Sequence, residues 1–105
     1  METLTDLLFE LSNDDRLNIL LDLEKGPKNL TRIAKDLDFT AQGTSRNVAR
    51  LVQNSMITRN PEGEYALTPY GSVSLELLSS YRFLSVNKQY FLSHDVSVLP
   101  YKFIN

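Results

Sequence analysis

Residues 30–57 constrain the fold of this chain more than any other stretch. Apolar side chains recur at helical spacing at Leu30, Ile33, Ala34 and Leu37, which predicts a short helix over about residues 31–37. Asp38 and Phe39 then turn the chain. Thr40 is a good N-cap for a second helix over about residues 40–54, because its hydroxyl can accept a hydrogen bond from a free backbone N–H. Two short helices joined by so tight a turn predict a helix-turn-helix.

The second of these helices has an apolar face and a polar face. We expect the apolar face to point inward, and it consists of Ala41, Val48, Leu51 and Val52. The opposite face consists of Gln42, Ser45, Arg46, Ala49, Arg50 and Gln53. No acidic residue occurs from Thr40 to Asn60. A helix that displays Gln, Ser and Arg without carboxylates can enter the DNA major groove and contact base edges and phosphates.

The candidate DNA contacts fall into two groups. Those on the second helix are Gln42, Ser45, Arg46, Arg50 and Gln53, flanked by Thr40, Thr44 and Asn47. Those that could hold phosphates from outside it are Lys28, Thr31, Arg32, Lys35 and Arg59. The alternative for all of them is an ordinary solvated face of a helical domain, since short motifs often match by chance.

Net charge argues weakly against nucleic acid, because the chain carries −2 over 105 residues. The charges are segregated, however. Residues 1–24 carry seven acidic side chains against one basic, whereas residues 25–60 carry seven basic side chains against two acidic. A basic patch on an acidic protein can still bind phosphates, because the local field decides.

Two further helices are predicted before the helix-turn-helix. Leu4, Leu7, Leu8 and Leu11 define an amphipathic helix across about Leu4–Leu11. Ser12 or Asn13 can then cap a second, largely buried helix that begins with two aspartates. That helix ends at a Lys-Gly-Pro sequence, residues 25–27, where glycine leaves the helix and proline prevents its return.

A β-hairpin is predicted directly after the helix-turn-helix. Residues 57–60 and 64–67 are short strand candidates, and Pro61, Glu62 and Gly63 lie between them as a turn. A hairpin in this place is a wing, in which Arg59 is the residue suited to touch DNA. The alternative is a plain structural hairpin, because the acidic residues Glu62 and Glu64 would oppose a phosphate backbone.

A long C-terminal helix is predicted from Pro69 to about Ser93, about 37 Å at about 1.5 Å per residue. This exceeds one face of so small a domain, so its far half needs an apolar partner. Pairing with a second copy, aided by the first helix, gives a homodimer. The residues expected in that interface are Leu4, Leu8, Leu77, Tyr81, Leu84 and Phe91. The alternative is a break near residues 85–87 and a return of the helix onto its own domain.

The composition excludes several classes of function. The chain has no cysteine and one histidine, which argues against disulfides, metal sites and a Ser/His/Asp triad. No nucleophile–base pair or phosphate-cradling loop stands out, so we expect neither an enzyme nor a cofactor. No stretch reaches the roughly 18 apolar residues that a membrane span requires, and a cytoplasmic location is expected.

The order of elements and several motifs resemble the winged helix-turn-helix of ArsR-like transcription regulators. The similar segments are LLFELSNDDRLNILLDLEKGP, NLTRIAKDLDFT, TSRNVARLVQNSMI and YALTPYGS. The segment NKQYFLSHDVSVLP is similar to archaeal regulators of the methanogenesis type, in which a winged-helix domain precedes a sensor domain. The resemblance implies a domain over residues 1–93 and a tail or linker over residues 94–105, leading towards a sensor domain outside this chain.

Three departures from the family pattern stand out. Asp38 and Ser55 occupy turn positions where the family usually has glycine. Asn54 could then end the second helix. The metal-sensing cysteines and histidines of some ArsR members are missing, which argues against metal sensing.

The sequence therefore predicts a mainly α fold with a small β-hairpin, a winged helix-turn-helix with an extra N-terminal helix and a long C-terminal dimerisation helix. The predicted function is that of a homodimeric, sequence-specific regulator that binds double-stranded DNA. The alternative is a winged-helix protein–protein interaction module without specific DNA recognition. The acidic first helix and hairpin tip favour that alternative, whereas the carboxylate-free helix face favours DNA.

Overall fold

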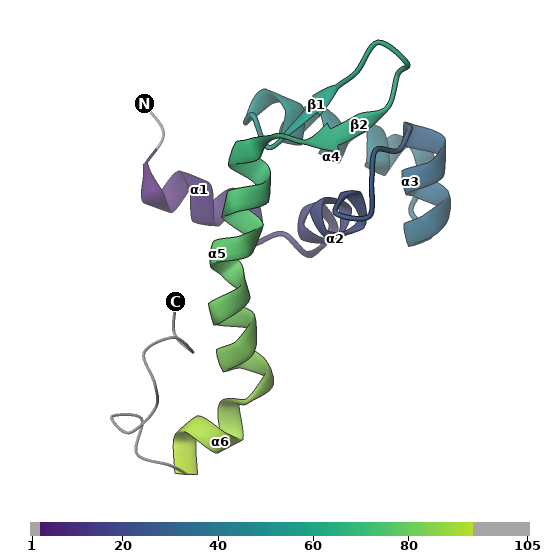
Figure 1. The fold of residues 1–105 in the computed structure, drawn as a ribbon. Helices are drawn as coiled ribbons and strands as arrows, with labels where there is room; N and C mark the ends of the chain where they lie inside the picture. The colour runs from purple at the N-terminus through teal and green to yellow at the C-terminus, as the bar shows by residue number, and fades with distance from the viewer. Residues whose placement is uncertain (1–2, 94–105) are drawn as a thin grey trace. The chain divides into compact units, whose positions relative to one another are not determined.

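The computed structural model describes residues 3–93, and the predicted tail, 94–105, lies outside them. The fold is mainly helical with one small antiparallel sheet (Figure 1). The elements are α1 (Leu4–Leu11), α2 (Asp14–Leu23), α3 (Leu30–Leu37), α4 (Ala41–Gln53), β1 (Ile57–Arg59), β2 (Tyr65–Leu67), α5 (Pro69–Val86) and α6 (Lys88–Ser93). The described residues fall into two compact units, residues 3–72 and residues 73–93.

Side-chain caps set the beginnings of the first four helices, each through a hydrogen bond from the third residue of the helix. Thr3 and Asp6 form a reciprocal capping box at α1. Asn13, Asn29 and Thr40 cap α2, α3 and α4. Of these caps the sequence correctly predicted Thr40, and Asn13 as one of two choices. Asn54 ends α4, also as expected.

The core of the first unit lies where α2, α3, α4 and the start of the hairpin meet. Seven apolar side chains there are less than 2% exposed: Ile19, Leu20, Ile33, Val48, Leu51, Met56 and Ile57. The inward face of α4 differs from the prediction, because Thr44 is buried with Val48 and Leu51. Ala41 and Val52 are exposed instead. The buried stripe therefore follows i, i+4, i+7 spacing, and the small Thr44 side chain satisfies its own hydroxyl by donating to the Thr40 carbonyl.

The hairpin pairs Ile57 with Leu67, Thr58 with Ala66 and Arg59 with Tyr65. An isolated bridge adds Lys28 on the other side of β2, with Lys28 N–H donating to the Tyr65 carbonyl and Tyr65 N–H donating back. This ties the segment between α2 and α3 to the hairpin, whose tip extends away from α2 (Figure 1).

A side chain would not fit at Gly71, where the chain leaves the hairpin. A Cβ there would lie 2.1 Å from the Met56 carbonyl oxygen, closer than any two such atoms can approach. Thr68 braces the same place, since its hydroxyl donates to the Ser55 and Met56 carbonyls. The first turn of α5 therefore lies directly against the end of the α4–β1 connection.

The predicted long helix is broken at Asn87, so the expectation of one continuous helix to Ser93 is wrong and the break anticipated by the alternative is present. The Asn87 side chain donates to the Phe83 carbonyl at 2.9 Å, which competes with continued helical bonding. Within this unit the Phe91 ring then meets the Phe83 ring edge-on, with centroids 5.7 Å apart.

Within residues 3–93, two non-glycine residues have positive φ, and both lie at turn positions where ArsR-like regulators usually have glycine. Asp38 (φ 55°) ends α3, and Ser55 (φ 63°) follows α4. The turns thus keep a left-handed conformation that costs an ordinary L-residue about 1–2 kcal/mol. Aspartate tolerates it better than serine does, so the larger strain falls on Ser55.

We expect Ser55→Gly to raise the free energy of unfolding by about 0.5–1 kcal/mol, because glycine removes the left-handed strain but adds entropy to the unfolded chain. Ser55→Ala keeps the Cβ and should give no such gain. Denaturant unfolding of both variants measures the difference, and a less stable Ser55→Gly would contradict the strain argument.

Candidate nucleic-acid interface

The exposed face of α4 carries most of the predicted recognition residues. Gln42, Ser45, Arg46, Ala49 and Gln53 are all exposed and share one side of the helix at i, i+3, i+4, i+7 and i+11 spacing. Arg46 is exposed, and within the described residues 3–93 its guanidinium makes no hydrogen bond or ion pair. Asn47 is half-buried beside this face. Thr40 is exposed, but its hydroxyl is engaged in capping the helix, accepting from the Gly43 N–H at 3.0 Å.

Thr44 does not belong to this face, which corrects its prediction as a DNA-flanking residue. Its side chain is fully buried, and its hydroxyl donates to the Thr40 carbonyl at 2.8 Å. It packs the helix onto the domain instead of facing a ligand.

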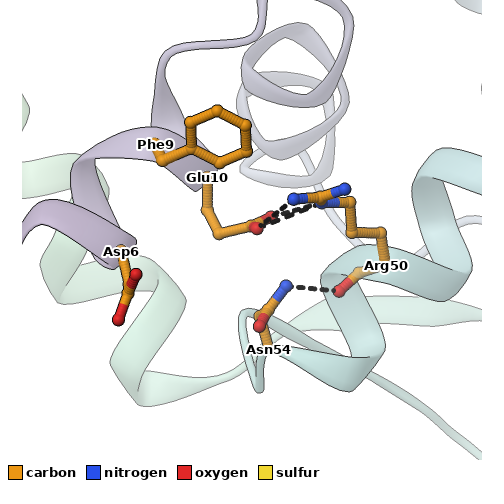
Figure 2. A pocket seen from close by; sticks show the side chains of 5 residues that line it. All are labelled: Asp6, Phe9, Glu10, Arg50 and Asn54. Carbon is orange, nitrogen blue, oxygen red and sulfur yellow. Dashed lines mark hydrogen bonds and ion pairs between the residues drawn. The ribbon is translucent and has the colours of Figure 1, made fainter. Parts of the chain in front are cut away.

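Arg50 also differs from its prediction as a free contact. Its Nε and Nη2 donate to the Glu10 carboxylate at 2.9–3.1 Å, in a two-pronged pair that joins α4 to α1. Figure 2 shows the guanidinium and the carboxylate facing each other across the gap between the two helices. Hydrogen bonding to Glu10 raises the pKa of Arg50 above its ordinary value. About 45% of the Arg50 side chain stays exposed, against 7% for Glu10.

Arg16 completes this cluster from α2. It is 6% exposed, its Nε lies 3.4 Å from the Glu10 carboxylate, and it donates to the backbone carbonyls of Glu10 and Phe9. The Phe9 ring lies near both guanidinium groups, at 5.9 Å from Arg16 and 5.4 Å from Arg50, within the range of cation–π attraction. One buried carboxylate therefore anchors the end of α1 to both α2 and α4.

A hollow of about 470 Å³ lies beside this cluster, lined by Asp6, Phe9, Glu10, Arg50 and Asn54. Asp6 points away from the ion pair, and the Asn54 amide donates to the Arg50 carbonyl at the end of α4 (Figure 2). Asp6 is engaged in the capping box, where bonding to the Thr3 backbone and side chain lowers its pKa. Each of the four polar residues around this hollow therefore already has at least one hydrogen-bond partner in the fold.

The cations predicted to hold phosphates from α3 are partly engaged in another network. The Lys28 ammonium donates to Asp22 at 2.8 Å and to Asp36 at 2.7 Å, and its side chain is only 15% exposed. Arg32 donates to Asp36 as well, but 65% of its side chain stays exposed. We therefore reassign Lys28 from phosphate binding to structure, and keep Arg32 with the exposed Thr31 and Lys35.

Arg59 is exposed on β1, where its guanidinium lies 6.0 Å from the centroid of the Tyr65 ring. The ring holds the side chain along the hairpin without neutralising its charge. Arg59 therefore remains a suitable phosphate contact.

Helical spacing indicates the Arg32–Asp36 pair at i and i+4, but no local pattern predicts the cluster around Glu10. Glu10 and Arg50 are 40 residues apart, and no local pattern predicts a contact over that distance. The one available hint was Glu10 itself, an acidic residue next to the apolar Leu11 in a helix whose outer face also carries leucines.

The described part of the chain shows no group of three or more metal-ligating side chains and no helix suited to crossing a membrane. Comparison with known proteins finds no family model that matches the chain and no matching curated protein.

The free energy of unfolding should fall at low pH, in part because Asp36 becomes protonated. Hydrogen bonding to Lys28, and more weakly to Arg32, lowers the pKa of Asp36 below its ordinary 3.8. The unfolded chain then binds the proton more readily, so the stabilisation is present above pH 3.8 and is lost as the pH falls further. We expect Asp36→Asn to flatten the acid limb of a denaturant-unfolding profile. Glu62→Gln, with the same charge change on the hairpin, is the control, and equal flattening by both would contradict the assignment.

Substitution of the two arginines of α4 should lower Tm to different extents. Arg50→Ala leaves the buried Glu10 with Arg16 as its one cation, and we expect Tm to fall by roughly 5–10 °C. Arg46→Ala, the same change one turn earlier on the exposed face, should shift Tm by no more than about 2 °C. Equal shifts in a thermal melt followed by circular dichroism would contradict the structural role of Arg50.

Proposed function

We propose that this chain is a sequence-specific regulator of transcription that binds double-stranded DNA through α4. The observation that carries the proposal is the exposed, carboxylate-free face of that helix, which presents Gln42, Ser45, Arg46 and Gln53. Packing of α3 against α4, with the hairpin directly after them, supports a winged helix-turn-helix in which α4 is the recognition helix.

The residues on this face have the donor and acceptor patterns that base recognition needs. Arginine can donate two parallel hydrogen bonds to guanine, and glutamine can pair in a similar way with adenine. Arg46 lies at the middle of the exposed face with Gln42 one turn before it. Thr31, Arg32, Lys35 and Arg59 would contact phosphates, which fix the position of the protein without selecting sequence.

The left-handed turns at Asp38 and Ser55 support the proposed kinship with ArsR-like regulators. The motif keeps its backbone conformation at both points where its usual glycine is replaced. We also propose that the chain is similar to archaeal regulators of the methanogenesis type and that it acts in the cytoplasm.

We propose a homodimer as the acting form. Large apolar side chains are exposed on α1, namely Leu4, Leu8 and Phe9, and separately on α5, where Leu77 and Tyr81 are each 68% exposed. Leu84 and Phe91 are half-buried. A second copy would cover such apolar surface. A two-fold dimer would bind two half-sites about 34–36 Å apart.

The second candidate is a protein-interaction module, favoured by the exposed Glu62 at the tip of the hairpin. An acidic tip would repel a phosphate backbone and would suit a basic protein surface. The two candidates differ in one measurable property, which is the ability to select a DNA sequence.

The experiment is enrichment of bound duplexes from a random pool at two salt concentrations. We expect a two-fold-symmetric site for the unaltered protein, and a loss of about 5–150-fold in affinity for that site in Arg46→Ala. Arg82→Ala, which removes an exposed cation outside α4, is the matched control. Arg50 stays intact, because its loss would disturb the fold. Weak binding that is indifferent to sequence and to Arg46→Ala would overturn the proposal in favour of the interaction module.

A further inference from the structure

We infer that Glu10 is a positioning residue for DNA recognition: through Arg50 it fixes α4 relative to α1 and so sets the spacing of the two half-sites that the dimer accepts. This inference rests on the proposed function. It assigns a role in that function to an acidic side chain on a helix outside the helix-turn-helix.

The Glu10–Arg50 pair has the geometry of a rigid link. Three donor–acceptor distances of 2.9–3.1 Å join one guanidinium edge to both carboxylate oxygens. Such a two-pronged arrangement fixes orientation as well as distance. Arg16 holds the same carboxylate and the backbone at the end of α1, so the link cannot swing about α1.

A DNA phosphate would not displace Glu10 from Arg50. The carboxylate side chain is 7% exposed, and a buried charge that loses its partner is penalised more strongly than a surface contact rewards. Arg50 therefore keeps its partner when the exposed face of α4 meets DNA. The half of its side chain that remains exposed leaves donors free while the bonded edge stays in place.

The Glu10–Arg50 link would connect α4 to the dimer interface through α1. α1 carries the exposed Leu4, Leu8 and Phe9, so a second copy that covers these residues would hold α1, and α4 would follow through Glu10 and Arg50. Gln42 lies about 12 Å along α4 from Arg50. A rotation of about 15° at the link would move Gln42 by about 3 Å, close to the rise of one base pair, about 3.4 Å.

The consequence is a separation of two properties. Base contacts on the outer face of α4 decide which half-site is bound, and the Glu10–Arg50 link decides how far apart two half-sites must be. Weakening the link should relax the second property and leave the first.

The test uses the full chain and duplexes that carry two copies of the selected half-site, with their spacing varied one base pair at a time around about 10–10.5 base pairs. Glu10→Gln keeps the side-chain size but removes the charge, and Arg50→Lys keeps the charge but cannot make the two-pronged pair. Arg46→Lys is the matched control, the same change one turn earlier on the exposed face. Each variant is first shown to unfold in a single cooperative thermal transition, and either link variant alone suffices.

We expect the unaltered protein to prefer its best spacing over the neighbouring one by about tenfold or more, and both link variants to reduce this ratio to within about threefold, with the half-site sequence unchanged. Arg46→Lys should weaken binding at every spacing and leave the ratio unchanged. Link variants that fold and keep the full spacing ratio would overturn the inference while the proposed function stands. An unaltered protein that selects no half-site would overturn both.

Discussion

The buried carboxylate of Glu10 is the constraint on which the arrangement of the first unit depends. A charge with 7% exposure needs cations, and it draws Arg16 from α2 and Arg50 from α4 to the end of α1. Three helices meet at this one group, although α1 contributes only Leu11 to the buried apolar core. An ion pair of this kind adds little net stability. It does specify one arrangement, because alternative packings would leave the carboxylate unpaired.

A second polar network, centred on Lys28, specifies how α2, α3 and the hairpin pack together. Lys28 joins Asp22 on α2 to Asp36 on α3 through its side chain, and its backbone extends the hairpin through Tyr65. Among the described residues, Oδ2 of the buried Asp22 carboxylate has no hydrogen-bond partner. Its Oδ1 accepts a hydrogen bond from Lys28 at 2.8 Å, and the more exposed Lys25 lies 3.5 Å from the same oxygen. The Lys28 network holds α3 and the Glu10 cluster holds α4, and these are the two helices proposed to contact DNA.

Local signals predicted most of the secondary structure, since caps, turns and apolar periodicity act within a few residues. Thr40 and Asn54 bound α4 as expected, and α1 spans the predicted residues. The failures involve tertiary choices. Which side of α4 is buried depended on what α2 and α3 present to it, and the helix broke at Asn87, where a side chain competes for the backbone. The assignment of Arg50 failed because its partner is distant in sequence.

The internal ion pairs change what the basic segment can contribute to DNA binding. Lys28, Arg32 and Arg50 are paired with carboxylates, so less of the positive charge of residues 25–60 can face a phosphate backbone than the sequence indicates. The proposed affinity then cannot rest mainly on counterion release, which scales with the number of phosphates neutralised. It must draw more on hydrogen bonds to base edges from the exposed face of α4. In a chain of net charge −2, the proposed specificity and affinity would then depend on the same few side chains of α4, with Arg46 at their centre.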